Sequence, residues 1–352
     1  MKAFVTGSTG LLGSALVREL ERDGHDVTAL VRSHEKAERV LGETDARIVV
    51  GDMLDVDGFA DELRGQDAVF HTAAYFREYF GVGERNHTEQ LRAVNVDATV
   101  DLLTAADDAG VDRVVYISSS GTIGPKADGS PSDESARRET TDTESYYFRS
   151  KILAERAIER FLVTHDLPVV MVLPGVMMGP GDAAPTAMGQ VVVDFVEGNL
   201  PTLPEGGFSF VDVRDVASAT VRSAERGESG ERYIVGGRYY DLSEFAEVLE
   251  RVTGVRAPKR VLPYRVGLAV GYASELAARV TGRDPLITCA AVRTVHEQVE
   301  LSSQKAIREL DVTFRPFDET LRDEVAWFRD NGYLDSPAER DSTATTTPTA
   351  TR

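Results

Sequence analysis

Three glycines near the N-terminus constrain the fold of this chain more than any other feature. Residues 6–13 read Thr-Gly-Ser-Thr-Gly-Leu-Leu-Gly, between an apolar strand pattern at residues 3–5 and a helical pattern at residues 16–20. In a dinucleotide-binding turn, the first glycine permits the tight turn, the second lets a pyrophosphate approach the backbone, and the third lets the helix pack on the strand. The helix N-terminus then faces the phosphates. The pattern predicts cofactor-binding residues at Gly7, Thr9, Gly10, Leu11, Leu12 and Gly13.

Strand and helix patterns alternate beyond this turn. Short β-branched runs bounded by turn residues predict strands at residues 26–31, 46–50, 68–71, 113–118 and 169–173. Apolar residues at helical spacing predict long helices at residues 89–109 and 145–165. This alternation is typical of a doubly wound parallel sheet. We therefore expect an α/β fold with a dinucleotide-binding Rossmann domain at residues 1–174.

The pattern becomes less regular beyond Pro174. It predicts a helix at residues 188–197 and a strand at residues 232–235 that either joins a second part or extends the main sheet. We expect residues 175–335 to form a smaller, mixed and mainly substrate-binding part that returns in places to the sheet. Residues 336–352 are rich in Thr and lack large apolar side chains, which predicts a disordered tail.

The charge balance narrows the range of partners. The chain has 39 basic and 58 acidic residues, a formal net charge of −19, and only six of the basic residues are Lys. This balance argues against nucleic-acid binding. An acidic, Lys-poor surface is also expected of a protein that stays soluble in concentrated salt. A halophilic source is therefore one hypothesis, and a GC-rich genome that favours Arg over Lys is another.

Hydropathy and cysteine content argue against a membrane-spanning protein and against a disulfide-linked or thiolate-metal one. No apolar run reaches the ~18 residues that would span a bilayer. The most apolar stretch, residues 266–273, is flanked by Arg265 and Glu275 and predicts a helix of the globular fold. The first strand begins at Lys2 and leaves no room for a signal peptide, so we expect a cytoplasmic protein without a membrane partner. Cys289 is the only cysteine, which excludes an intrachain disulfide and a thiolate metal cluster and predicts a buried apolar role.

A phenol and an ammonium stand four residues apart, at Tyr147 and Lys151, and hence on one face of the predicted helix. A nearby ammonium can lower the pKa of a phenol toward the working pH, which suits proton transfer. Tyr146 has no such partner, because the residue four positions further on is Ser150. The spacing alone is common in helices, but this helix leaves the loop after the strand predicted at residues 113–118, and that position makes Tyr147 and Lys151 candidate catalytic residues.

The end of the second predicted strand bears on the choice of cofactor. An NAD enzyme places an acid there to bind the ribose hydroxyls. This chain instead has Val31 followed by Arg32, with no acid before Glu35. An available guanidinium suits a 2′-phosphate. The sequence thus favours NADP over NAD and adds Arg32 to the cofactor-binding residues.

Three further segments, residues 69–74, 114–122 and 173–180, carry a family pattern, and residues 320–334 strengthen it. On these residues the chain resembles the extended short-chain dehydrogenase/reductases of the NAD-dependent epimerase/dehydratase kind. Within that group it is most similar to dihydroflavonol 4-reductase-like proteins and to the hopanoid-associated sugar epimerase group. The resemblance covers nearly everything from Met1 to Leu334.

This resemblance implies a set of catalytic roles. Tyr147 is the general acid/base, and Lys151 holds the nicotinamide ribose and depresses the pKa of Tyr147. Ser119, with Ser120 as the second choice, hydrogen-bonds the reacting oxygen. Asn95 supports a proton relay.

The same resemblance implies additional cofactor contacts near the ends of strands. These are Asp52, Met53, Ala73, Ala74 and Pro174. Asp52 matches an adenine contact, and the two alanines are small because the backbone there passes close to the cofactor. His71 matches a histidine at a strand end and is expected to be structural.

Three functions follow from these residues. The first is hydride transfer between NADP(H) and a carbonyl or alcohol of a small organic substrate, by the ketoreductase pattern. The second is epimerisation of a nucleotide-linked sugar with tightly held NAD, for which dehydration is a less favoured variant. The third is a non-catalytic, cofactor-binding regulator. The resemblance also implies a homodimer formed through the helices at residues 89–109 and 145–165.

Overall fold

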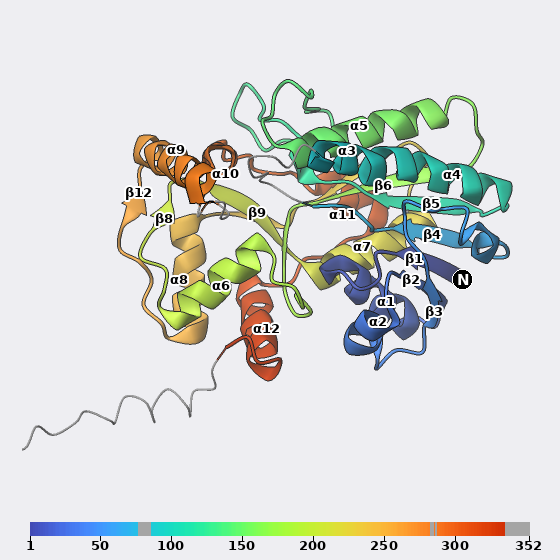
Figure 1. The fold of residues 1–352 in the computed structure, drawn as a ribbon, viewed down its shortest axis with the longest axis horizontal. Helices are drawn as coiled ribbons and strands as arrows, with labels where there is room; N and C mark the ends of the chain where they lie inside the picture. The colour runs from blue at the N-terminus through green and yellow to red at the C-terminus, as the bar shows by residue number, and fades with distance from the viewer. Residues whose placement is uncertain (77–85, 282–284, 286, 335–352) are drawn as a thin grey trace, which may run out of the picture.

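The computed structural model describes residues 1–76, 86–281, 285 and 287–334. Its main element is a seven-stranded sheet in the order β10-β6-β5-β4-β1-β2-β3 (Figure 1). All neighbours in this sheet are parallel. The strands are β1 (Lys2–Thr6), β2 (Asp26–Val31), β3 (Arg47–Val50), β4 (Ala68–His71), β5 (Arg113–Ile117), β6 (Val169–Pro174) and β10 (Arg232–Val235). The strand order reverses between β1 and β4, which is where open α/β sheets bind ligands.

Helices cover both faces of this sheet. In β1, Ala3 and Val5 belong to the apolar cluster of one face and Phe4 to that of the other, because strand side chains alternate. The first face is covered by α1 (Leu11–Arg22), α2 (His34–Leu41), α7 (Val213–Arg226) and α11 (Gln304–Leu310). The second is covered by α4 (Ala98–Asp108), α5 (Tyr146–Phe161) and the 3-10 turn Ala60–Leu63.

A second, smaller part lies beside the large sheet (Figure 1). It contains a three-stranded sheet in the order β11-β9-β7 and a separate two-stranded pair of β12 with β8. These strands are β7 (Val176–Met178), β8 (Leu203–Pro204), β9 (Gly207–Asp212), β11 (Arg238–Asp241) and β12 (Val261–Leu262). Its helices are α6 (Ala187–Glu197), α8 (Leu242–Thr253), α9 (Tyr264–Thr281), α10 (Cys289–His296) and α12 (Phe317–Asp330). Phe210, Phe245 and Phe317 lie at the centre of its apolar cluster.

The predicted α/β fold with a doubly wound parallel sheet is confirmed. The strand predicted at residues 232–235 extends the main sheet as β10, parallel to β6. The helix predicted at residues 89–109 is interrupted: α3 (Asn86–Arg92) leads into a π-helical turn, Ala93–Asp97, before α4 begins. The tail prediction for residues 336–352 lies outside the described residues.

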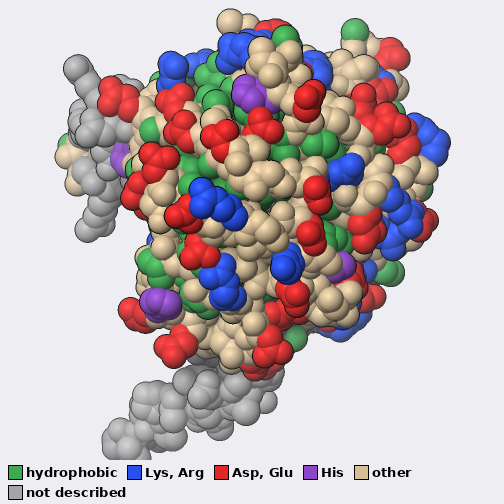
Figure 2. All heavy atoms as spheres, turned by 90° about the vertical axis from the view of Figure 1, so that its right-hand side faces the viewer, with side chains coloured by type: hydrophobic (Ala, Val, Ile, Leu, Met, Phe, Trp, Pro, Cys, Tyr) green, Lys and Arg blue, Asp and Glu red, His purple; other side chains and the backbone are tan. Residues whose placement is uncertain are grey.

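Two features are absent from the described part of the chain. No helix there is both long and apolar enough to cross a bilayer. Within the same residues, no three His, Cys, Asp or Glu side chains gather as metal ligands. Cys289 is buried, and burial raises the pKa of its thiol. Acidic side chains are spread over the face seen in Figure 2, with Lys and Arg between them.

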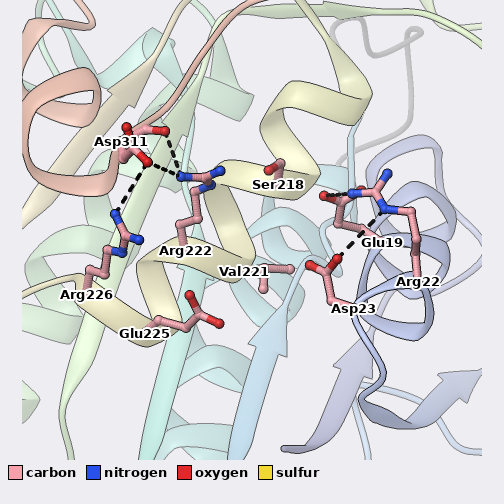
Figure 3. A pocket seen from close by; sticks show the side chains of 9 residues that line it. All are labelled: Glu19, Arg22, Asp23, Ser218, Val221, Arg222, Glu225, Arg226 and Asp311. Carbon is pink, nitrogen blue, oxygen red and sulfur yellow. Dashed lines mark hydrogen bonds and ion pairs between the residues drawn. The ribbon is translucent and has the colours of Figure 1, made fainter.

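A charged pocket lies between α1 and α7 (Figure 3). The Asp311 carboxylate forms ion pairs with the guanidinium groups of Arg222, at 2.9 Å, and Arg226, at 3.7 Å. Nearby, Arg22 forms an ion pair with Glu19. This pocket lies toward the C-terminal end of α1, whereas the glycine turn is at the opposite end of that helix. None of the predicted catalytic residues lines it.

Candidate active site

The glycine turn between β1 and α1 has the geometry that the sequence predicts. Gly7 has a φ of +69°, and a Cβ there would lie 2.6 Å from the backbone nitrogen of Ala73. A Cβ on Gly13 would lie 2.1 Å from the carbonyl oxygen of Gly7. Gly10 is the N-cap of α1 and has no side chain to accept the first N–H groups of the helix. The turn therefore presents backbone donors to an anion.

The residues after this turn differ in exposure. Thr9 and Leu11 are partly exposed, Gly10 is exposed, and Leu12 is buried in the apolar cluster beneath α1. Only the backbone of Leu12 can therefore face a ligand.

His71 connects two strands of the large sheet, β4 and β1, with helix α4. Its Nδ1 lies 2.8 Å from Thr6 Oγ1, and its Nε2 lies 3.1 Å from Thr99 Oγ1 in α4. Burial lowers the pKa of His71 to about 3, with a smaller contribution from the charge of Lys151. The imidazole is therefore neutral and structural, as expected from the sequence.

The backbone after β4 passes against the glycine turn. The hydroxyl of Thr72 donates to the carbonyl oxygen of Thr6 at 2.7 Å, and the N–H of Ala73 donates to Thr6 Oγ1 at 3.2 Å. Ala73 is half-buried and Ala74 is exposed. Ala73 thus lies at the carboxyl edge of the sheet beside Gly7, and Ala74 follows it in the chain.

The end of β2 carries more positive charge than the sequence analysis recognised. Arg32 is exposed, and Ser33 caps α2 by accepting from the N–H of Lys36 at 3.3 Å. Burial lowers the pKa of Lys36, and the nearby charges of Arg32 and Arg39 lower it further. Arg32, Lys36 and Arg39 therefore lie near one another, and we call these three residues the cation cluster, although Glu35 and Glu38 are on the same helix. Their spacing of four and three residues was the available signal.

Beyond β3, Asp52 and Met53 have different surroundings. Asp52 is exposed, and its Oδ1 accepts from the N–H of Leu54 at 2.9 Å. Met53 is buried among the apolar side chains of the α4 and α5 face.

Lys151 is buried at the carboxyl end of β5. Its Nζ donates to the carbonyl oxygen of Ile117 at 2.6 Å and to the hydroxyl of Tyr116 at 3.2 Å. It also lies 4.7 Å from the centre of the Tyr116 ring. Burial lowers the pKa of Lys151 to about 7, and the Glu155 carboxylate opposes that shift. Lys151 is therefore fixed in place and titrates near neutral pH.

Tyr147 lies one helical turn before Lys151 on α5. Its ring packs edge-on against Phe76, with 4.7 Å between the ring centres. Burial raises the pKa of Tyr116, and the neighbouring Tyr147 and Glu155 raise it further. The Coulombic effect of Tyr147 on Tyr116 indicates that Tyr147 lies near the group that holds Lys151.

A buried polar network behind Lys151 was missed by the sequence analysis. Glu155 forms a buried ion pair with Arg232 of β10 at 3.0 Å. Its other carboxylate oxygen accepts from Ser118 and, at 2.9 Å, from Thr122. The sequence could have indicated this network, because α5 carries a functional polar side chain every four residues, at Tyr147, Lys151 and Glu155. The network ties α5, the end of β5 and β10 together.

Ser119 occupies the turn directly after β5. Its Oγ accepts from the N–H of Gly121 at 3.1 Å, and the residue is only partly buried. A Cβ on Gly121 would lie 2.1 Å from the ring of Phe148, so this glycine allows the start of α5 to pack against the turn. Ser118 is engaged with Glu155 and Ser120 begins the 3-10 turn, so Ser119 remains the candidate that the position favours.

Asn95 lies in the π-helical turn and is buried. Its Oδ1 accepts from the N–H of Tyr75 at 2.7 Å, and its Nδ2 donates to the carbonyl oxygen of Tyr75 at 2.9 Å. The same Nδ2 donates to Ser150 Oγ at 2.9 Å, next to Lys151 in the chain. Asn95 thus connects the segment after β4 with α5.

With this geometry established, comparison with known proteins identifies the family. The sequence model of the NAD dependent epimerase/dehydratase family matches residues 3–236, which include the glycine turn, Ser119, Tyr147 and Lys151. The chain belongs to this family. It is an NAD(P)-dependent enzyme of the extended short-chain dehydrogenase/reductase type, a reductase or an epimerase.

Two curated relatives of this epimerase/dehydratase-family enzyme span nearly its whole length. A putative dihydroflavonol 4-reductase of Synechocystis sp. is 32% identical, over 94% of this chain and 95% of the relative. Sterol demethylase protein B of Methylococcus capsulatus is 31% identical, over 95% of this chain and 100% of the relative. The crystal structure of a nucleoside-diphosphate-sugar epimerase from Pseudomonas aeruginosa has a TM-score of 0.79 at 25% identity, covering 95% of this chain and 99% of that one.

The epimerase/dehydratase fold brings most of the predicted residues to one edge of the large sheet. The glycine turn, Ala73 and Ser119 follow the carboxyl ends of β1, β4 and β5, and Pro174 is the last residue of β6. Lys151 reaches the same edge through its bond to Ile117. Asp52 lies further along the sheet, after β3.

Proposed function

We propose that this enzyme transfers a hydride between NADP(H) and a carbonyl or alcohol of a small organic substrate. The observation that carries the proposal is the exposed Arg32 directly after β2, where no acid precedes Glu35, with Lys36 and Arg39 of the cation cluster following in α2. A 2′-phosphate, which NAD lacks, would bind favourably among three cations. The similarity to a putative dihydroflavonol 4-reductase supports the same function.

The described residues fit a dinucleotide at the carboxyl edge of the sheet. The tight positions of Gly7 and Gly13 and the uncapped start of α1 suit a pyrophosphate. The residues proposed to hold the cofactor are Gly7, Thr9, Gly10, Leu11, Leu12, Gly13, Arg32, Asp52, Met53, Ala73, Ala74, Tyr147, Lys151 and Pro174. When bound, the nicotinamide supplies or accepts the hydride. Residues 1–174 would thus hold the cofactor, and residues 175–335 mainly the substrate.

The proposed proton transfer involves four residues of the site. In the reducing direction, the Tyr147 hydroxyl donates its proton to the carbonyl oxygen of the substrate. The Ser119 hydroxyl donates a hydrogen bond to the same oxygen and stabilises its developing negative charge. The Lys151 ammonium stabilises the phenolate left on Tyr147. Asn95 positions α5 against the segment after β4 through Ser150 and Tyr75.

Replacing one cation of the cluster tests the choice of cofactor. We expect Arg32→Ala to raise the Kd for NADPH by about tenfold or more, because a charged hydrogen bond is lost. The Kd for NADH should stay unchanged. Arg308→Ala, on the exposed surface of α11, is the matched control and should change neither Kd. An equal change in both Kd values for Arg32→Ala would contradict NADP binding at this cluster.

The second candidate function is nucleotide-sugar epimerisation with tightly bound NAD. The similarity to a nucleoside-diphosphate-sugar epimerase favours it. The two functions differ in the fate of the cofactor, because a reductase consumes it and an epimerase regenerates it. A non-catalytic regulator is disfavoured, since Tyr147, Lys151, Ser119 and Asn95 are all retained.

A further inference from the structure

The longest acid-free stretch of this acidic chain folds into an exposed surface. Residues 252–274 contain no Asp or Glu, although the whole chain has 58. The stretch runs from the end of α8 through β12 into α9, at the outer end of the smaller part (Figure 1). Its cations are exposed and form no ion pair among the described residues: Arg256, Lys259, Arg260 and Arg265.

The outward face of α9 is apolar along its length. Exposed apolar residues recur there every three or four positions, at Val266, Val270, Ala273, Ala277 and Val280. Leu276 beside them is 61% exposed, and Val280 is 81% exposed. Glu275, the only acid of the helix, instead accepts from the N–H of Cys289 at 2.7 Å.

The opposite face of α9 already packs against α10. A Cβ on Gly267 would lie 3.2 Å from Val292, and one on Gly271 would lie 3.1 Å from the nitrogen of Cys289. These glycines allow close contact between the two helices. The outward face therefore takes no part in this packing, and a contiguous exposed apolar patch is typical of an interaction site.

We propose that the α9 surface, defined as the outward face of α9 with Lys259 and Arg260 just before β12 and Arg265 in the first turn of α9, binds the surface of an anionic lipid bilayer. A helix with one apolar face and basic residues beside it lies in the plane of such an interface. Each cation near anionic lipid strengthens adsorption by about fivefold. The net charge of −19 repels the rest of the protein from anionic lipid, which favours approach through this face.

Charge also distinguishes this partner from a second copy of the chain. Two copies meeting through the α9 surface would bring the same cations together. The carboxylates that contact this stretch, those of Glu205, Glu250 and Glu275, already accept from backbone N–H groups of their own chain. Anionic headgroups supply the missing charge. The inference departs from the expectation of no membrane partner, because an interfacial helix needs only one apolar face and no spanning run.

Helix α10, which packs on the inward side of α9, contacts the segment that leads to Tyr147. Arg293 of α10 pairs with Glu144, three residues before Tyr147, and Glu297 pairs with Arg138 at 2.7 Å. Lipid binding would therefore hold this segment near the bilayer. An apolar carbonyl compound dissolved in lipid could then reach the site, a consequence that rests on the proposed function.

Co-sedimentation of the full chain with vesicles tests the proposal. The protein should sediment with vesicles of phosphatidylcholine mixed with phosphatidylglycerol and remain in solution with phosphatidylcholine alone. The double variant Leu276→Asp, Val280→Asp should bind the mixed vesicles at least about tenfold more weakly. Val163→Asp, at an exposed valine just after α5, is the matched control and should bind like the wild type.

A second pair of variants tests the charge. Lys259→Glu with Arg260→Glu should weaken binding by about 25-fold or more, from about fivefold for each cation lost. Arg64→Glu, on the exposed surface near β4, should not. An unchanged circular dichroism spectrum and thermal unfolding midpoint show that each variant is folded.

Three results would overturn the proposal. The first is wild-type protein that stays in solution with the mixed vesicles. The second is equal vesicle binding by the α9 variants and their controls. The third is a lipid-free dimer, seen by sedimentation velocity, that the Leu276→Asp, Val280→Asp variant dissociates. Because no readout here depends on turnover, failure of lipid binding would leave the proposed hydride transfer unaffected.

Discussion

The carboxyl edge of the large sheet buries charged side chains, whereas the α9 surface exposes apolar ones. At the edge, three charged side chains are buried: Lys151, Glu155 and Arg232. Glu155 and Arg232 form an ion pair, and Lys151 donates to the carbonyl oxygen of Ile117. On α9, Leu276 and Val280 are exposed beside cations that have no ion pair among the described residues. Both arrangements are unfavourable in themselves, since burying charge and exposing apolar surface cost free energy. The two proposals account for this difference: the edge would orient reacting groups, and the helix face would bind a lipid surface.

The largest effect is expected at the reacting edge. Tyr147→Phe keeps the ring packed against Phe76 but removes the hydroxyl, so turnover with NADPH and a carbonyl substrate found by screening should fall about a thousandfold. NADPH binding should persist. Tyr146→Phe is the control, because that hydroxyl has no lysine four residues on, and it should leave kcat unchanged. Full activity of Tyr147→Phe would refute the proton-transfer role.

The buried network should dominate stability. Glu155→Gln leaves Arg232 buried without its counter-charge, and we expect the free energy of unfolding to fall by about 3 kcal/mol. Glu62→Gln breaks the exposed pair with Arg47 and should cost less than about 1 kcal/mol. Denaturant unfolding of both variants measures the two losses of free energy. Equal losses would show that the buried ion pair contributes no more to stability than the exposed one.

The glycine turn offers a matched test of ligand approach. Gly7 and Gly24 both have positive φ, but a Cβ at Gly7 meets the backbone of Ala73 whereas Gly24 has open space. We expect Gly7→Ala to raise the Kd for NADPH by about tenfold, because that turn must move. Gly24→Ala should leave the Kd unchanged. Fluorescence titration would decide, and similar Kd values for the two variants would argue against a pyrophosphate at the turn.

Proton occupancy at Lys151 should set the pH dependence of reduction. Because burial lowers the pKa of Lys151 to about 7, its charged form is present below that pH and is lost above it. The value of kcat/KM should therefore fall by about tenfold per pH unit above neutrality. In Glu155→Gln the profile should move to lower pH, since the carboxylate opposes the lowered pKa. A pH profile that stays flat to high pH would show that the charge of Lys151 does not affect the reaction.

The smallest stability effect is expected on α9. Leu276→Ser should change the free energy of unfolding by less than about 0.5 kcal/mol, because the side chain is exposed. Leu102→Ala, inside α4, should cost about 3 kcal/mol. A large loss for Leu276→Ser in thermal or denaturant unfolding would mean that the outward face of α9 serves the fold.

Local patterns predicted the geometry of the glycine turn and of the helix that carries Tyr147 and Lys151. The glycine turn is encoded within eight residues, and Tyr147 with Lys151 within five, so their geometry follows from one turn and one helix. The Glu155–Arg232 pair was missed because its partners are far apart in the chain and meet only through the pairing of β10 with β6. No propensity signal marks the π-helical turn that holds Asn95.

The α9 region was predicted only in part. Residues 266–273 indicated a helix of the globular fold, and α9 confirms it. Its exposure could not be predicted, because an apolar helix is expected to be buried unless the packing of its neighbours is known. The inward glycines that pack on α10 decide which face remains outside.

The fate of the cofactor tests the central claim most directly. Purified protein, in molar salt, is titrated with NADPH and with NADH while nicotinamide fluorescence is followed, and released nucleotide is measured after precipitation of the protein. Hydride transfer with NADP(H) predicts protein without copurifying nucleotide and reversible binding that prefers NADPH. Copurifying NAD that emerges only on denaturation would contradict that claim and favour the nucleotide-sugar epimerase.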